Sequence, residues 1–326
     1  MKKHIYIYSP SSAVRDKAAF RRGVKRLTAL GYEVEIDEAA LTKTQRFAGE
    51  DAVRVASIAR AAASGADVAL ISRGGYGLTR ILPAINYKAV AKAVEKGARF
   101  VGLSDFTAFQ MALLAKTGAV TWAGPAVGED FGTAETPDDI MEACFDDLIT
   151  GQAEGTGWTL PKSDLSGEKP FQVKDAVLWG GNLAVLASLV GTPYLPAIKG
   201  GILFVEDVGE HPYRVERMLT QLLHAGVLAS QKAIVFGQFS NYKLVPGYDS
   251  GFNMAAVVAR LQSQVKARVV TGLPFGHVPT KVLLPVGMKT TLAVEGRDAF
   301  VLWGHLHTRD GHHHEHHGHD HDGHHH

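Results

Sequence analysis

Short apolar segments alternate with longer amphipathic segments through the first hundred residues of the chain. The pattern predicts strands at 5–8, 33–36, 68–71 and 100–103, and helices at 19–30, 52–63 and 89–96. Such alternation is typical of βαβ units in a parallel sheet. Ligands of these sheets bind beyond the carboxyl ends of the strands, which is where the loops 9–12, 72–77 and 104–105 fall. We therefore expect the three loops to meet at one site.

The pattern changes near residue 151. Between 151 and 174 the chain is polar and rich in Gly, Pro, Ser and Thr, which indicates an interdomain segment. Mixed structure follows, with strands expected at 201–207, 233–238, 268–271, 282–285 and 291–294, and helices at 183–190, 213–225 and 254–265. We predict an α/β protein with an N-terminal nucleophile domain (1–150), a linker (151–175), a C-terminal domain (176–308) and a tail (309–326).

Composition narrows the possible partners. The 34 Lys and Arg residues balance 33 Asp and Glu residues, so no overall positive field attracts nucleic acid or an anionic membrane. The apolar run Ile5–Tyr8 is too short for a secretory signal, and no segment reaches the roughly 18 apolar residues that span a bilayer. Cys144 is the single cysteine, which excludes an internal disulfide and fits a reducing compartment. We expect a cytoplasmic protein in which Cys144 is a small buried hydrophobe.

The C-terminal tail is rich in histidine. From Asp310 onward it holds ten of the sixteen histidines, interleaved with Gly, Asp and Glu, and we expect it to be disordered. Imidazoles bind Zn, Ni or Cu, so His312–His326 are candidates for nonspecific metal binding, and an artificial or solubilising tail is equally compatible with this composition. We expect no metal in the active site.

The strongest candidate for chemistry is Ser104. It ends the apolar strand Val101–Leu103 and precedes a helix-like run at 106–114, which places a hydroxyl on a sharp strand-to-helix turn. Such a hydroxyl can act as a nucleophile when a base takes its proton and backbone N–H groups stabilise the oxyanion. We assign the oxyanion hole to the N–H groups of Asp105 and Gly75. Phe106 replaces the second glycine of the hydrolase elbow G-x-S-x-G, and Ser104 as a simple helix N-cap is the alternative.

A base and a carboxylate can be proposed for this serine. His277 follows a strand end in a Gly-containing loop, which can present an imidazole to a cleft. A base of this kind needs a carboxylate to orient it, and Glu206 at the end of a buried strand is our candidate. Strand alternation puts Glu206 and Asp207 on opposite sides, so we expect only one of them to face His277. The alternative for Glu206 is an ion pair with Arg214 or Arg217.

The loop from Arg73 to Gly77 is the candidate for substrate binding. Its glycines permit close backbone approach, and it matches neither G-x-G-x-x-G nor G-x-x-x-x-G-K-[ST]. We assign Arg73, Gly74 and Tyr76 to the substrate, with Arg73 as a clamp for a carboxylate. A structural ion pair that holds the loop is the alternative for Arg73.

Several blocks together resemble one family. They are Arg46–Gly49, Arg73–Gly77, Gly102–Ala108, Trp179–Leu183, Gly191–Pro193, Val205–Asp207, Glu210–Met218 and Gly272–His277. With these blocks in this order, the chain resembles the LD-carboxypeptidases of serine peptidase family S66. The resemblance extends to about residue 305. The family's nucleophile, acid and base fall on Ser104, Glu206 and His277.

This resemblance also implies a fold and a reaction. The fold would be an N-terminal amidotransferase-like parallel-sheet domain and a C-terminal swivelling β/α domain, with a cleft between them and commonly a homodimer. The reaction would release terminal D-alanine from murein tetrapeptides by hydrolysis of its amide with the L-centre of meso-diaminopimelate or L-lysine, without a cofactor. Two alternatives stay open, namely a peptidase similar to the microcin C immunity peptidases, which cleave aminoacyl-nucleotides, and a non-catalytic module that binds murein peptides or metal.

Overall fold

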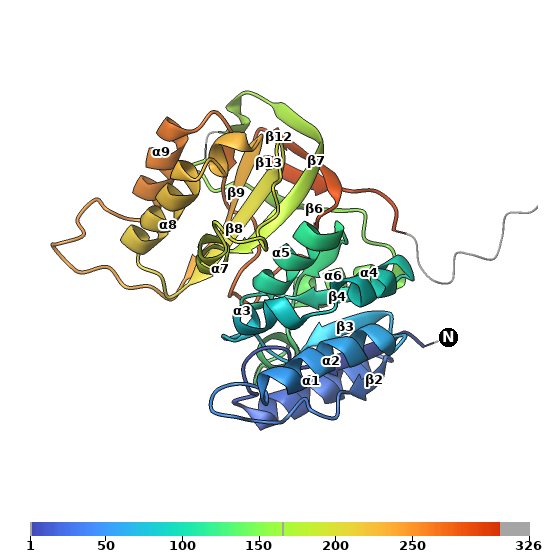
Figure 1. The fold of residues 1–326 in the computed structure, drawn as a ribbon. Coiled ribbons are helices and arrows are strands. Elements are labelled where there is room, and N and C mark those ends of the chain that lie inside the picture. The colour runs from blue at the N-terminus through green and yellow to red at the C-terminus, as the bar shows by residue number, and fades with distance from the viewer. Residues whose placement is uncertain (1, 165, 307–326) are drawn as a thin grey trace, which may run out of the picture.

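The chain folds into two α/β lobes, each built around one sheet (Figure 1). The computed structural model describes residues 2–164 and 166–306. In the N-terminal lobe the strand order is β11-β5-β4-β3-β1-β2, and β1 to β5 run parallel while β11 is antiparallel to β5. The strands are β1 (His4–Tyr8), β2 (Glu33–Ile36), β3 (Val68–Ile71), β4 (Arg99–Gly102), β5 (Thr121–Ala123) and β11 (Leu284–Val286). The predicted parallel sheet is confirmed.

The sheet of the C-terminal lobe is half parallel and half antiparallel. Its order is β10-β9-β8-β7-β12-β13-β6, with β7 to β10 parallel and the other pairs antiparallel. The strands are β6 (Gly155–Thr159), β7 (Phe171–Asn182), β8 (Ile202–Val208), β9 (Ala233–Ser240), β10 (Arg268–Val270), β12 (Lys289–Glu295) and β13 (Asp298–Leu302). The parallel half therefore directs the ends of β7 and β8 toward one edge, as in the first lobe.

Helices cover both faces of the N-terminal sheet. Along β1 the side chains of Ile5 and Ile7 pack in one apolar cluster with α1 (Lys17–Ala29) and α6 (Asp139–Thr150), because alternate residues of a strand face opposite sides. Tyr6 and Tyr8 face the second cluster, which includes α2 (Asp51–Ala63), α4 (Tyr87–Glu95) and α5 (Phe106–Thr117). The remaining α-helices of the described residues are α3 (Leu78–Ile81), α7 (Leu183–Ser188), α8 (Pro212–His224) and α9 (Met254–Gln264).

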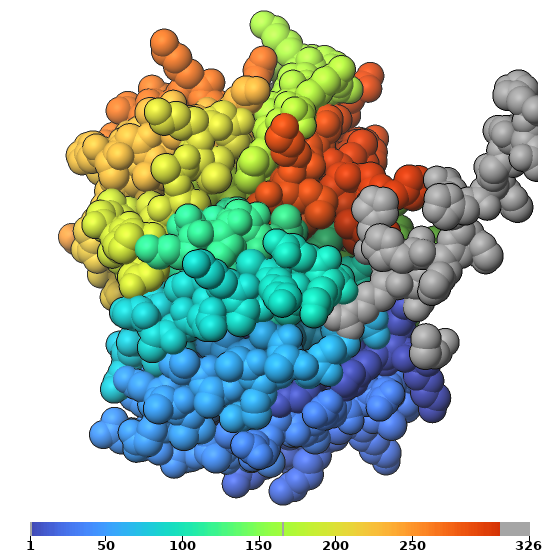
Figure 2. Space-filling view, turned by 45° about the vertical axis from the view of Figure 1, so that its right-hand side comes forward, coloured from blue at the N-terminus to red at the C-terminus, as the bar shows by residue number. Residues whose placement is uncertain are grey.

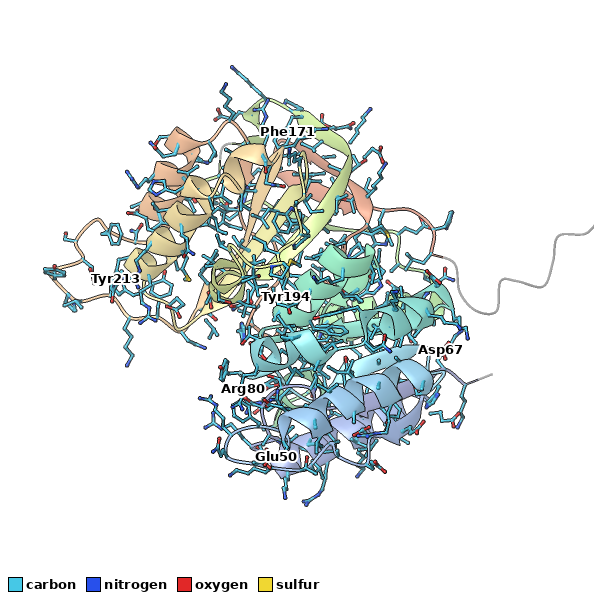
Figure 3. The ribbon with its side chains drawn as sticks, viewed as in Figure 1. Glu50, Asp67, Arg80, Phe171, Tyr194 and Tyr213 are labelled. Carbon is cyan, nitrogen blue, oxygen red and sulfur yellow. The ribbon has the colours of Figure 1, made fainter. Side chains whose placement is uncertain are left out.

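Helix α5 lies where the two lobes meet. Its residues from Phe106 to Leu114 are all buried, which agrees with a sequence that carries no polar stripe. It contacts α3 and α4 on one side and α7 and β7 on the other, and Figure 2 shows the corresponding green band between the blue and the yellow-to-red parts. Near this junction Tyr194 (Figure 3) packs its ring against the ammonium of Lys116 from α5, at 5.3 Å. The second apolar cluster is therefore continuous across both lobes.

Two segments lie where the sequence pattern did not place them. Strand β11, expected within the C-terminal range, returns to the N-terminal sheet and pairs with β5. The polar segment 151–174 contains β6, which forms an edge of the C-terminal sheet beside β13. The division into domains stays a prediction. None of the helices that the structure describes is both long and apolar enough to cross a membrane.

Candidate active site

A cavity of about 690 Å³ opens at the carboxyl ends of the strands, between the two lobes. The N-terminal lobe lines it with the loop after β3, with Leu103 and Ser104 after β4, and with a short π-helical turn at Val127–Phe131. The facing wall comes from Val208 at the end of β8 and from His277 and the residues after it. The structure therefore brings Ser104 and His277 to one cavity.

Ser104 sits in a constrained turn. Its φ is 64°, in the left-handed region that costs a non-glycine residue of the order of 1–3 kcal/mol. Two nearby glycines keep the surroundings of this turn open: a Cβ on Gly102, at the end of β4, would lie 2.7 Å from the Phe106 ring, and one on Gly74, in the loop after β3, would lie 2.7 Å from Ser104 Cβ. The β4-to-α5 turn thus holds the Ser104 hydroxyl against the loop after β3.

The proposed oxyanion donors belong to the two segments that meet at Ser104, the turn into α5 and the loop after β3. Asp105 precedes the first turn of α5, and Gly75 lies in the facing loop with a φ of 101° that favours glycine. Within the part of the chain that the structure describes, neither N–H donates a hydrogen bond. Free N–H groups at a helix N-terminus and in a glycine loop are suited to bind a developing negative charge.

The carboxylate of Asp105 has a second, structural task that the sequence did not reveal. It accepts hydrogen bonds from Ser11 Oγ and from the N–H of Leu78 at 2.9 Å, so it ties together the loops after β1 and β3. Burial raises the pKa of Asp105, although these donors and the charge of Arg54 oppose the shift. Arg54, fully buried on α2, donates to the carbonyl oxygens of Pro10 and Gly77 at 3.3 and 2.8 Å and braces the same loops.

His277 is held by the carboxylate predicted for it. Its Nδ1 lies 2.7 Å from Oε2 of Glu206, whose side chain is fully buried, and its carbonyl oxygen accepts a hydrogen bond from Ser240 Oγ at 3.1 Å. Gly276 makes this approach possible, because a Cβ there would meet the carbonyl oxygen of Gln238 at 2.9 Å. Burial alone lowers the pKa of His277, but the hydrogen bond and charge of Glu206 outweigh it, so the pKa is raised.

The two arginines considered as alternative partners of Glu206 form no ion pair with it among the described residues. Among the described residues Glu206 forms no ion pair with Arg214 or Arg217, and Arg214 pairs with Glu210 at 2.6 Å instead. The carboxylate therefore serves the imidazole and the network behind it.

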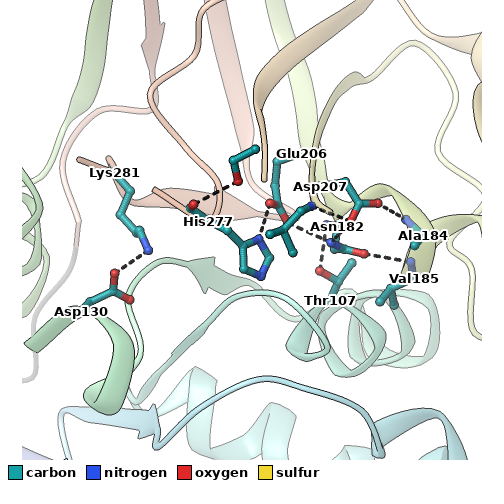
Figure 4. A network of polar contacts seen from close by, with 11 residues as sticks. Thr107, Asp130, Asn182, Ala184, Val185, Glu206, Asp207, His277 and Lys281 are labelled. Atoms are coloured by element: carbon teal, nitrogen blue, oxygen red, sulfur yellow. Dashed lines mark hydrogen bonds and ion pairs between the residues drawn. The ribbon is translucent and has the colours of Figure 1, made fainter. Parts of the chain in front are cut away.

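That network centres on Asn182 at the end of β7 (Figure 4). Its amide donates to Glu206 Oε1 at 3.2 Å and to Asp207 Oδ1 at 2.9 Å, while its backbone N–H donates to Thr107 Oγ1 of α5 at 3.0 Å. Gly181 allows this approach, since a Cβ there would lie 2.6 Å from the Thr107 hydroxyl. Asn182 thus links the helix that follows the serine to the carboxylate that holds the histidine.

Asp207 is the second carboxylate of this network. It also accepts from the N–H of Ala184 at 2.9 Å, and it makes no hydrogen bond to the imidazole among the described residues. Burial raises its pKa to about 6, with a further increase from the neighbouring Glu206 charge. The role of Asn182 was missed, although the block Trp179–Leu183 carried the signal that could have pointed to it.

Ser104 and His277 are not in hydrogen-bond contact within the described structure. Nε2 of His277 is left without a hydrogen bond on the cavity side, and the Ser104 hydroxyl lines the same space. Catalytic hydrogen bonds are often long without substrate and tighten in the complex. The two side chains therefore share one cavity, and proton transfer between them stays a prediction.

Charged residues form the remaining wall. Arg73 donates to the carbonyl oxygen of Ala13 at 3.2 Å and its Nε lies 3.5 Å from Glu129, so it fulfils the structural alternative while still lining the cavity. Lys281 and Asp130 form a buried ion pair at 2.5 Å, seen on the other side of His277 in Figure 4. Neither Lys281 nor Asp130 was singled out from the sequence.

Two further predicted substrate residues also lie at the cavity. Gly74 and Tyr76 line it, and Tyr76 is 44% exposed as a residue. Tyr76 is held from behind by its N–H, which donates to Ser12 Oγ at 2.9 Å. Its ring packs beside Phe47 and Arg46 and leaves part of its surface open to the cavity.

Within residues 2–164 and 166–306, no cluster of three or more His, Cys, Asp or Glu side chains is arranged to hold a metal ion. The His-rich tail lies outside the described residues. Cys144 packs between the apolar clusters, and burial raises the pKa of its thiol.

Comparison with known proteins identifies the class. The profile of the LD-carboxypeptidase N-terminal domain matches residues 5–124, and that of the C-terminal domain matches residues 175–292. The crystal structure of a muramoyltetrapeptide carboxypeptidase from Oxalobacter formigenes is 40% identical with a TM-score of 0.83, over 93% of this chain and 99% of that one. The chain belongs to the LD-carboxypeptidase family, the serine peptidases of family S66.

Two further relatives carry names that refer to different functions. A protein of Bacillus subtilis named a probable murein peptide carboxypeptidase is 28% identical over 276 residues, 84% of each chain. The microcin C7 self-immunity protein of Escherichia coli is 26% identical over 259 residues, 72% of this chain and 73% of that one.

Proposed function

We propose that this protein is a serine carboxypeptidase that releases terminal D-alanine from murein tetrapeptides, in the recycling of peptidoglycan. The observation that carries the proposal is the single cavity that holds a serine in a left-handed strand-to-helix turn and a histidine bonded to a buried glutamate. The names of the murein carboxypeptidases among its relatives support the same substrate.

In this mechanism the Ser104 oxygen attacks the carbonyl carbon of the scissile amide while His277 Nε2 takes the hydroxyl proton. The imidazolium that forms is stabilised by Glu206, which accepts from Nδ1 at 2.7 Å. The N–H groups of Asp105 and Gly75 bind the oxyanion. His277 then gives its proton to the nitrogen of D-alanine as the C–N bond breaks, and water hydrolyses the acyl-serine by the reverse roles.

The carboxylate of the leaving D-alanine needs a cationic partner. We assign this role to Arg73, with Gly74 and Tyr76 beside it, because all three line the cavity within the loop that faces Ser104. A guanidinium pairs with a carboxylate through two parallel hydrogen bonds. We also propose that the protein acts in the cytoplasm as a homodimer without a cofactor.

Cleavage of aminoacyl-nucleotides is the competing activity, and the relative from Escherichia coli is the reason to test it. Among the described residues of the cavity lining, Tyr76 and the imidazole of His277 are the aromatic rings. A nucleobase gains much of its binding energy from stacking on aromatic side chains. Tyr76 is therefore the side chain of this lining best placed to stack on a nucleobase, and an assay with both substrates decides between the two activities.

Mass spectrometry of a tetrapeptide incubated with the pure protein tests the proposal directly. The expected change is the loss of one alanine residue, and Ser104→Ala is expected to lower the rate by several orders of magnitude. An aminoacyl-sulfamoyl adenosine offered in the same assay measures the competing activity. Deleting residues 310–326 should leave hydrolysis intact, whereas a metal-binding module would lose its main activity. Near-normal release of D-alanine by Ser104→Ala would refute the assignment.

A further inference from the structure

A second hollow adjoins the active-site cavity on the N-terminal lobe. Its volume is about 620 Å³, and it is formed by the loop between β1 and α1 together with residues 43–46. Arg46 and Arg73 line both this hollow and the active-site cavity, so the two spaces are neighbours that share a wall. We call the second hollow the basic basin, defined by Arg15, Lys17, Lys43, Arg46 and Arg73.

The charge of the basin is one-sided. Its described lining carries these five cationic side chains and no Asp or Glu, whereas the whole chain has a formal net charge of only +1. The active-site cavity differs, because its lining pairs Lys281 with Asp130 and Arg73 with Glu129. Like charges gathered in a concave surface raise the local concentration of counter-ions.

Four cations of the basin have no ion-pair partner among the described residues, whereas Arg73 is also held by Glu129 and by the carbonyl oxygen of Ala13. Among the residues that the structure describes, Arg15, Lys17 and Lys43 form no ion pair within 4.0 Å. The guanidinium carbon of Arg46 lies 5.7 Å from the centre of the Tyr76 ring, and Arg46 forms no ion pair among the described residues. Arg60, by contrast, pairs with both Asp37 and Glu38.

Arg73 pairs with Glu129, but one of its donors has no hydrogen-bond acceptor among the described residues. Its Nε is buried and donates no hydrogen bond within the described structure, since Glu129 at 3.5 Å is beyond good hydrogen-bond geometry. Leaving a buried donor of a charged group unpaired is unfavourable. An anion at the boundary of the two spaces would supply the acceptor.

Lys17 carries a positive charge at the end of a helix where a positive charge is unfavourable. It is the first residue of α1, whose first turn contains no acidic residue, and the positive end of a helix dipole disfavours a cation. The cap at Asp16 accepts from the N–H of Ala19 at 2.8 Å and faces the helix. A lysine here is therefore unfavourable for the helix alone, yet it adds to the positive charge of the basin.

We propose that the basic basin is an anion subsite of the active site, which binds a carboxylate or phosphate group of the substrate that lies outside the scissile bond. This identification of the ligand as part of the substrate rests on the proposed function. The binding of an anion itself does not, so the two can be tested apart.

The test compares two double variants of the full chain. Lys17→Gln with Lys43→Gln removes two charges of the basin, and Lys88→Gln with Lys92→Gln removes two exposed charges from α4. On the tetrapeptide we expect the basin variant to raise KM about ten-fold at low salt with kcat nearly unchanged, and the difference to shrink as salt screens the charges. Its melting temperature should be equal or higher than that of the wild type, because Lys17 opposes the helix dipole.

Two further experiments decide whether the peptide or a phosphate group supplies the anion. If the peptide supplies it, a tetrapeptide with its side carboxylates converted to amides should bind wild type and basin variant alike. If a phosphate supplies it, pyrophosphate should raise the melting temperature of the wild type and of the α4 variant but not of the basin variant. This arm is run at pH 8, where the tail imidazoles are neutral.

Each outcome bears on one proposal. A wild-type protein that leaves the tetrapeptide intact counts against the proposed function, and the pyrophosphate arm still judges the basin. Equal KM values and equal pyrophosphate shifts in the two double variants would overturn the anion subsite.

Discussion

Replacing Glu206 by glutamine tests how the histidine is activated. The change keeps the shape of the side chain and removes the charge beside His277 Nδ1, to which it is bonded at 2.7 Å. The glutamine oxygen can still accept this hydrogen bond and orient the imidazole, although the glutamine NH2 group then faces the Asn182 amide, which donates to Glu206 Oε1 in the wild type. What is lost is the stabilisation of the imidazolium that forms as Ser104 attacks.

The size of this loss follows from the geometry. Two unit charges whose centres lie about 4 Å apart interact by about 4 kcal/mol at an effective dielectric constant of 20, which suits a pair that is buried on the Glu206 side and partly exposed on the His277 side. That energy corresponds to a rate lower by about a thousand-fold. The pKa of His277 also changes, because Glu206 raises it against burial, which lowers it.

The assay is the pH profile of kcat/KM for D-alanine release. The wild type needs neutral His277, so its acid limb should lie above the ordinary histidine pKa of about 6.5. In Glu206→Gln the limb should move to lower pH while the plateau falls. Glu210→Gln, which removes a carboxylate paired with Arg214 instead, is the matched control and should keep the wild-type profile. A plateau within about ten-fold of the wild type, or an unmoved acid limb, would refute this account of the pair.

Three other substitutions follow from the same geometry. Ser104→Gly should abolish activity yet raise the free energy of unfolding by about 1 kcal/mol, measured by urea denaturation, because it relieves the φ of 64°. Gly74→Ala should lower kcat/KM at least about a hundred-fold, since its Cβ would lie 2.7 Å from Ser104 Cβ and displace the nucleophile. Asp207→Asn should remove part of the pH dependence of stability. On folding, the pKa of the Asp207 carboxyl rises from 3.8 to about 6, so the wild-type protein loses about 3 kcal/mol of unfolding free energy as the pH rises through that window.

Controls separate these effects from general damage. Ser188→Gly, at the end of α7, should destabilise the protein, opposite to Ser104→Gly. Gly226→Ala strains a turn that does not line the cavity and should spare activity. For Asp207→Asn, an unfolding free energy that varies with pH between 4 and 7 as in the wild type would contradict the expected burial cost.

The sequence predicted which loops surround the site, because the ends of strands can be recognised from local patterns of apolar residues. Apolar runs at 5–8, 68–71 and 100–103 place their following loops at one edge, and these loops line or brace the cavity. Ser104, Glu206 and His277 were found by the same reasoning, and their catalytic roles stay predictions.

The bracing of the site could not be predicted, because it depends on contacts between distant segments. Asn182 joins Thr107 to Glu206 across 75 and 24 residues of sequence, and Arg54 reaches Pro10 across 44. No local pattern distinguishes such a buried polar residue from an exposed one. The return of β11 to the first sheet was missed for the same reason, since three residues carry too little periodicity to show a partner.

The return of β11 means that the two halves of the sequence cannot be separated cleanly. A fragment ending near residue 150 would lack the strand that covers β5, and the unpaired N–H and C=O groups of β5 would then form an open edge that invites pairing with another chain. It would also expose the face of α5 that packs on α7 and β7. Such a fragment should aggregate when produced alone, and adding residues 284–286 through a short linker should restore part of its solubility.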